Sequence, residues 1–132
     1  MSGALSIGEL GRATGVKPTT IRWYEAEGLL PAPARSEGGH RVYAQAHLHR
    51  LSFIRHARDL GFPMPAIRAL LDLAAEPERD CTAAHAAATT QIAAIDDKLR
   101  QLTALRAELS RLAHACQGGT VAECRILETL AS

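Results

Sequence analysis

The chain has 132 residues, a formal net charge of +1 and only 4% aromatic residues. This length leaves room for one small domain and a long helix, and it excludes two full cores. No apolar run is long enough to span a bilayer, and the N-terminal residues lack the charged and apolar regions of a secretion signal. We therefore expect a cytoplasmic, all-α protein with no membrane partner.

The small net charge hides an uneven distribution. Residues 1–68 contain nine Lys and Arg against five Asp and Glu, a net of +4, whereas residues 69–132 contain six against nine, a net of −3. This asymmetry predicts that a polyanion binds the N-terminal part alone. The three cysteines cannot form a complete set of intramolecular disulfides, so they are available as ligands, reactive groups or core residues.

Residues 6–28 predict a helix-turn-helix. Ser6 followed by Glu9 is the pattern of a capping box at the start of a first helix, and a Gly-containing turn comes after it. Pro18 occupies an early, tolerated position in a second helix, which stops at Gly28. Two helices joined in this way are typical of DNA-binding proteins, although any helical hairpin with a Gly turn resembles them.

Residues 35–43 predict a wing, which is a hairpin of two short strands around a Gly-Gly turn. Further helices are expected over residues 46–60 and 66–75, with a Gly- and Pro-rich break between them. The expected head is thus a winged helix-turn-helix domain over residues 1–75.

Residues 76–116 are expected to form a linker and a long dimerisation helix, which spans Cys81 to Cys116 without Gly or Pro. The apolar residues of this helix form one narrow seam along its length. A seam so narrow needs a partner helix to cover it, and we expect a coiled-coil homodimer. The helix places its two terminal cysteines about 50 Å apart, so they cannot share a ligand within one chain. In an antiparallel dimer centred near Lys98 and Leu99, Cys81 of one chain lies beside Cys116 of the other. The apolar residues of the seam recur at steps of three and four: Ile92, Ile95, Leu99, Leu102, Leu105, Leu109 and Leu112.

Together these motifs resemble the DNA-binding head of the MerR family of bacterial transcription regulators. The tail resembles the metal-responsive branch of that family, with one Cys at each end of the dimerisation helix and a third across a short loop. The resemblance implies a regulator and not an enzyme: a homodimer that binds double-stranded operator DNA and, when metal binds, distorts the promoter so that RNA polymerase engages it. The matching stretches are Ile7 to Leu10, Thr20 to Glu25, Gly28 to Pro31, Arg35 to Tyr43 and Leu51 to Arg55.

The second helix and the wing supply the candidate DNA contacts. Helix N-terminal amides and hydroxyls bind phosphate, and Arg and Lys reach guanine edges. We expect the arginines of the wing and of the following helix to contact phosphate, and we expect Trp23 to pack in the core. The candidates are Lys17, Thr19, Thr20, Arg22, Tyr24, Arg35, His40, Arg41, Tyr43 and Arg55.

Residues 117–132 are expected to form a metal-binding loop and a short helix. We expect Cys116, Cys124 and the partner's Cys81 to bind a soft metal ion. The seven residues between Cys116 and Cys124 resemble the copper-type loop, but copper(I) needs only two thiolates, whereas a divalent ion prefers more. The third cysteine therefore favours cadmium, lead, mercury or zinc. Copper(I) sensing, thiol-oxidation sensing and a ligand role for His85 stay open as alternatives.

Overall fold

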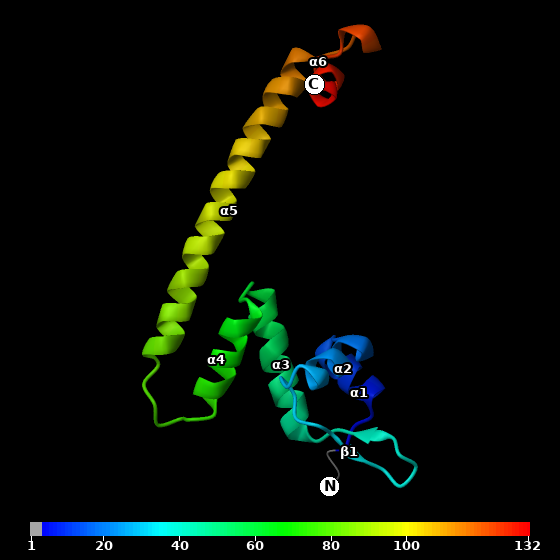
Figure 1. Cartoon of the computed structure of the whole chain (residues 1–132), viewed down its shortest axis with the longest axis vertical. Helices are drawn as coiled ribbons and strands as arrows, with labels where there is room; N and C mark the ends of the chain where they lie inside the picture. Colours follow the sequence, from blue (N-terminus) through cyan, green and yellow to red (C-terminus); the bar gives the residue numbers. More distant parts are fainter. Residues whose placement is uncertain (1–3) are drawn as a thin grey trace. The chain divides into compact units, whose positions relative to one another are not determined.

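The computed structural model describes residues 4–132 (Figure 1). It confirms the predicted helical class, with one small two-stranded sheet in the described part. The elements in chain order are α1 (Ile7–Thr14), α2 (Pro18–Ala26), β1 (Ala34–Arg35), β2 (Arg41–Val42), α3 (Gln45–Asp59), α4 (Met64–Ala74), α5 (Thr82–Ala115), the 3₁₀ helix η1 (Val121–Glu123) and α6 (Arg125–Ala131).

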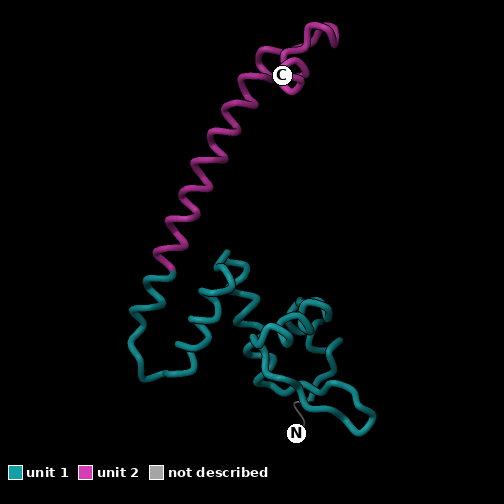
Figure 2. The backbone as a smooth tube through the Cα atoms, viewed as in Figure 1, with its two compact units in different colours: residues 1–87 teal, residues 88–132 magenta. Residues whose placement is uncertain are grey.

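The chain divides into two compact units, residues 1–87 and 88–132 (Figure 2). The first unit takes in the predicted head together with the linker and the first residues of α5. The three-part division expected from the sequence (residues 1–75, 76–116 and 117–132) was based on motifs. Neither of its boundaries coincides with the boundary between the two compact units, which lies after residue 87. Among the described residues, no helix is long and apolar enough to cross a membrane.

The first helix begins at the predicted capping box. The Ser6 hydroxyl accepts a hydrogen bond from the Glu9 N–H at 3.1 Å, and the Glu9 carboxylate accepts one from the Ser6 N–H at 2.8 Å. The bond from the Ser6 backbone is the main reason that the pKa of Glu9 lies below its ordinary range. The helix ends at Thr14, and the C-cap Gly15 has a φ of 75°, which suits Gly; a Cβ there would also collide with the guanidinium group of Arg55.

The core of the first unit lies among α1, α2, α3 and α4. Burying a side chain of this size stabilises the fold by about 1.5–3 kcal/mol, so this cluster holds the four helices together. Half-buried Leu5, Ile7 and Phe53 pack around it. The buried residues are Leu10, Ile21, Tyr24, Leu29, Leu30, Tyr43, Leu51, Ile54, Ala57, Ile67 and Leu71.

The wing forms as predicted, with short strands. β1 and β2 are antiparallel, with Ala34 opposite Val42 and Arg35 opposite Arg41. Beyond β2 the chain pairs once more, because Tyr43 exchanges two backbone hydrogen bonds of 2.8 Å with Leu5. This bridge ties the base of the wing to the segment that precedes α1.

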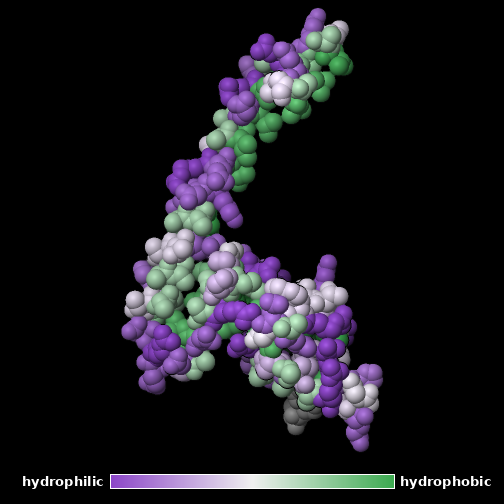
Figure 3. All heavy atoms as spheres, in the orientation of Figure 1, coloured by the Kyte–Doolittle hydropathy of each residue, from purple (hydrophilic) through white to green (hydrophobic). Residues whose placement is uncertain are grey.

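Helix α5 is continuous over 34 residues, from Thr82 to Ala115, in agreement with the predicted helix. The Asp80 carboxylate accepts a hydrogen bond from the Thr82 N–H at 3.0 Å, so Asp80 caps the first turn. The seam residues from Ile92 to Leu109 are 42–65% exposed in this single chain. Figure 3 shows hydrophobic atoms along one edge of the C-terminal part of α5 and hydrophilic atoms along the other. An exposed apolar stripe of this kind is the surface that a partner helix covers.

Candidate DNA-binding surface and metal centre

The structure leaves most of the predicted DNA-binding side chains accessible. Lys17 is the N-cap of α2, and among residues 4–132 no side chain caps the first turn of that helix. The first amides of α2 and a basic side chain therefore lie together, which is the arrangement that binds a phosphate. The accessible candidates are Lys17, Thr19, Thr20, Arg22, Arg35, His40, Arg41 and Arg55.

Two of the predicted DNA contacts are buried in this chain: Tyr24 is only 4% exposed and Tyr43 is fully buried. Their contact with DNA stays a prediction. The bridge to Leu5 places the Tyr43 ring inside the head, where it packs edge-on against His47 with ring centres 5.3 Å apart. The ring of Tyr24 faces the core beside Ile21 on the buried side of α2. Both tyrosines therefore support the surface from beneath.

Tyr43 takes part in a cluster that joins the wing to α2. Its hydroxyl donates to the carboxylate of Glu25, and Arg41 Nε donates to the other oxygen of that carboxylate at 3.2 Å. Burial, reinforced by the hydrogen bond to Glu25, raises the pKa of Tyr43. The Glu25 side chain is only 11% exposed, whereas the Arg41 side chain is 31% exposed, so the carboxylate is largely buried and the guanidinium group still reaches solvent. This cluster fixes where the wing lies relative to α2.

Three arginines of α3 and α4 donate to backbone carbonyls of the helix-turn-helix. Arg55 donates to Thr14 at the end of α1, Arg50 Nε to Leu29 at 2.5 Å, and Arg68 Nη2 to the Glu27 carbonyl at 2.6 Å. Cations at helix C-termini satisfy carbonyls that have no helical partner. Sequence reasoning missed this function for Arg50 and Arg68. Contact of Arg55 with phosphate stays a prediction, beside this structural function.

Trp23 is 46% exposed, so the prediction that it packs in the core was wrong. The buried face of α2 is set by Ile21 and Tyr24, three residues apart. Trp23 lies next to that face and points outward, with its ring 5.5 Å from the ring of Tyr24. The three-residue spacing of Ile21 and Tyr24 was the signal in the sequence that would have placed it.

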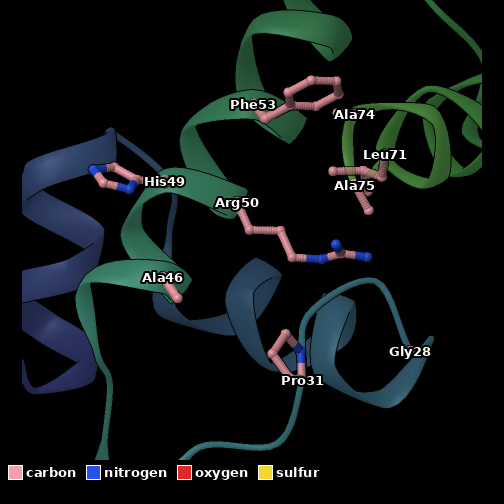
Figure 4. A pocket seen from close by; sticks show the side chains of 9 residues that line it. All are labelled: Gly28, Pro31, Ala46, His49, Arg50, Phe53, Leu71, Ala74 and Ala75. Atoms are coloured by element: carbon pink, nitrogen blue, oxygen red, sulfur yellow. The ribbon is translucent and has the colours of Figure 1, made fainter. Parts of the chain in front are cut away.

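An open hollow of about 660 Å³ lies between α3, α4 and the loop after α2 (Figure 4). Arg50 extends across it toward the Gly28–Pro31 loop, and Phe53 and Leu71 line the opposite side. The described residues that line it include one histidine and one arginine, and no carboxylate or thiol. The hollow therefore offers neither an acid–base pair nor a set of metal ligands.

The cysteines of the tail come together. Cys116 directly follows α5, Cys124 is the N-cap of α6, and their Sγ atoms are 3.2 Å apart. Both thiols are free and half-buried. The loop between them contains Gly118 and Gly119, whose φ values of 126° and 103° are accessible mainly to Gly.

Local hydrogen bonds favour the thiolate form of Cys124. The backbone of Leu127, the Cys116 side chain and the backbone of Ile126 all lower the pKa of Cys124, the first of them most. Thiolates are the form in which cysteine binds metal ions. Two thiolates bound to one tetrahedral ion at about 2.3 Å lie about 3.8 Å from each other. The two Sγ atoms, 3.2 Å apart, therefore need to separate only slightly to bind such an ion.

Cys81 stands apart from this pair. It is exposed, it immediately precedes α5, and its carbonyl accepts the His85 N–H at 3.0 Å. Among the described residues of the chain, no three His, Cys, Asp or Glu side chains lie together as a metal site. The structure thus brings together two of the three predicted ligands, and Cys81 is not beside them.

Comparison with known proteins yields matches over nearly the whole chain. The family model described as "MerR HTH family regulatory protein" matches residues 5–74, and the model "MerR, DNA binding" matches residues 48–112. The HTH-type transcriptional regulator HmrR of Rhizobium leguminosarum bv. viciae is 40% identical over 126 residues, which are 96% of this chain and 97% of the relative.

Two solved structures are similar and contain metal ions. The transcription regulator PbrR691 from Ralstonia metallidurans CH34, in complex with lead(II), has a TM-score of 0.80 and 43% identity, with 96% of this chain and 98% of that chain covered. The regulator MerR from Bacillus megaterium MB1, in complex with a mercury(II) ion, has a TM-score of 0.72 and 32% identity, with 97% and 100% covered.

Proposed function

This chain belongs to the MerR family of helix-turn-helix regulators and is a DNA-binding, metal-sensing transcription regulator, and from that premise we propose that it senses a soft divalent ion through Cys116, Cys124 and the partner's Cys81. Regulators of this family bind operator DNA and act as dimers. The inducer is cadmium, lead, mercury or zinc.

The observation that carries this proposal is the pair of thiols 3.2 Å apart, with no third ligand beside them in the described chain. Two thiolate ligands are sufficient to bind copper(I), whereas a divalent ion is better bound by three. Cys81 is the one cysteine left, and helix α5 of about 50 Å separates it from Cys116 of its own chain. It becomes the third ligand when a second copy lies antiparallel along α5.

The exposed seam on α5 supports the homodimer. Six leucine and isoleucine side chains between Ile92 and Leu109 are each at least 42% exposed, and covering them with the same stripe of a second chain removes that apolar surface from water. An antiparallel arrangement produces two identical sites, one at each end of the coiled coil.

A metal site shared between two chains couples ligand binding to the arrangement of the two heads. The heads contact operator DNA through the start of α2 and through the wing, whose position the Glu25 cluster fixes. We propose that metal binding moves the heads so that the DNA between them is bent and untwisted, and that RNA polymerase in the cytoplasm then engages the promoter.

Metal binding to the reduced wild-type protein and to Cys81→Ser tests this proposal. Native mass spectrometry reports stoichiometry, and competition with a chromophoric chelator reports affinity for cadmium, zinc and copper(I). We expect two cadmium ions per wild-type dimer and a loss of more than about tenfold in the cadmium affinity of Cys81→Ser, since even groups beyond the ligands contribute about 10–100-fold. His85→Ala, one turn along α5, tests the alternative in which His85 is a ligand; with three thiolates as the ligands, this variant should bind cadmium normally. Equal cadmium affinity in Cys81→Ser and wild type would overturn the three-thiolate site and favour copper(I).

A further inference from the structure

The contact between Cys116 and Cys124 is close enough for a second kind of chemistry. Their Sγ atoms are 3.2 Å apart, and a disulfide forms when two such atoms approach to about 2.05 Å. Both side chains are half-buried, so a small oxidant reaches them. Gly118 and Gly119 leave the backbone between them free to adjust, because Gly adopts conformations that strain other residues.

We propose that Cys116 and Cys124 form a reversible disulfide within one chain, and that this modification switches metal sensing off. This inference rests on the proposed metal site, because oxidation removes two of its three thiolates. The oxidant is a hydroperoxide, of which hydrogen peroxide is the simplest.

The reaction proceeds in two steps that balance. One thiolate attacks a peroxide oxygen, the O–O bond breaks, and a sulfenic acid and one water form after protonation. The second thiol then attacks the sulfenic sulfur, the S–S bond forms, and the hydroxyl group leaves with the thiol proton as a second water. Two thiols and one hydrogen peroxide thus give one disulfide and two waters. A dithiol reductant reverses the change by exchange.

Cys81 of the same chain takes no part in this disulfide, because the 34 helical residues of α5 separate it from Cys116. The partner's Cys81 lies beside the pair in the proposed dimer, and a disulfide with it would link the two chains covalently, which distinguishes it from the disulfide proposed here. The disulfide also leaves the seam and the DNA-binding residues of the head unchanged. We therefore expect the oxidised protein to remain a dimer, to keep its affinity for DNA and to lose its affinity for metal. Bound metal occupies the same sulfur atoms and protects them.

The test uses Cys81→Ser, in which Cys116 and Cys124 are the remaining thiols. After treatment with hydrogen peroxide, intact mass should fall by about 2 Da per chain, the loss of two hydrogens, and the chain should run as a monomer on a non-reducing denaturing gel. Cys81→Ser carrying Cys124→Ser as well is the matched control and should show no such loss. An unchanged mass, stable sulfenic or sulfinic products, or a covalent dimer in Cys81→Ser would overturn the inference.

A second measurement follows the consequence in wild type. Peroxide should reduce cadmium affinity more than about tenfold, while operator affinity changes less than about twofold. Dithiothreitol should restore cadmium binding. Cadmium added before the peroxide should prevent the mass change. If protein that has lost about 2 Da per chain, the mass change of one disulfide, still binds cadmium with undiminished affinity, the proposal that the disulfide switches metal sensing off is overturned. The two proposals fail separately: a protein that loses this mass but never binds cadmium when reduced refutes the metal site alone, and one that binds cadmium but never loses the mass refutes the disulfide alone.

Discussion

Replacing Tyr43 with Phe removes one hydroxyl from the interior of the head and leaves the buried ring in place. That hydroxyl donates to the Glu25 carboxylate, which Arg41 also contacts at 3.2 Å. A hydrogen bond to a charged group contributes about 1.5–3 kcal/mol. Because Glu25 keeps Arg41 as a partner, we expect the cost to lie near the lower end, about 1.5–2 kcal/mol of unfolding free energy.

Tyr24→Phe is the matched control. Tyr24 is also buried in the head, but its hydroxyl lies 3.5 Å from Arg58 Nη1, at the outer limit for a hydrogen bond. Its loss should cost less than about 0.5 kcal/mol. Urea unfolding followed by circular dichroism, at one fixed protein concentration because folding and dimerisation are linked, measures both variants. Equal losses of stability would refute the function assigned to the Glu25 cluster.

The alkaline pH dependence of stability offers a second readout. Burial and Glu25 raise the pKa of Tyr43, so the folded protein holds the hydroxyl proton more tightly than the unfolded chain. The resulting stability is fully present below the ordinary tyrosine pKa, about 10, and is lost as the pH rises through the raised value. The advantage of wild type over Tyr43→Phe should therefore shrink in strongly alkaline solution.

Three further changes test the turn, the seam and the DNA surface. Gly15→Ala places a Cβ against the Arg55 guanidinium group at a φ of 75°, and should lower the unfolding free energy by more than about 1 kcal/mol in the same urea assay. Leu99→Glu combined with Leu102→Glu should give monomers in analytical ultracentrifugation, with weak operator binding because each monomer contacts a single half-site; a normal dimer would refute the seam. Arg22→Ala should reduce operator affinity in a fluorescence anisotropy titration and leave cadmium affinity unchanged, and unchanged operator affinity would remove Arg22 from the DNA surface.

The sequence by itself determined the elements whose causes are local. Ser6 and Glu9 are three residues apart, so the capping box could be predicted and formed with bonds of 3.1 and 2.8 Å. The absence of Gly and Pro between Cys81 and Cys116 predicted α5 to within one residue at each end. The seam also followed from spacing alone, since helical periodicity decides which side chains share a face.

The tertiary structure decided which polar and aromatic side chains the head uses internally. Arg55 contacts Thr14, and Arg68 contacts Glu27, across 41 residues of sequence in each case. Tyr43, a predicted DNA contact, is buried in the head, where its backbone pairs with Leu5. A basic or aromatic residue on a helix has the same local pattern whether it contacts DNA or a carbonyl of its own chain. Only the packing of α1 to α4 determines which of these partners lies within reach of a side chain.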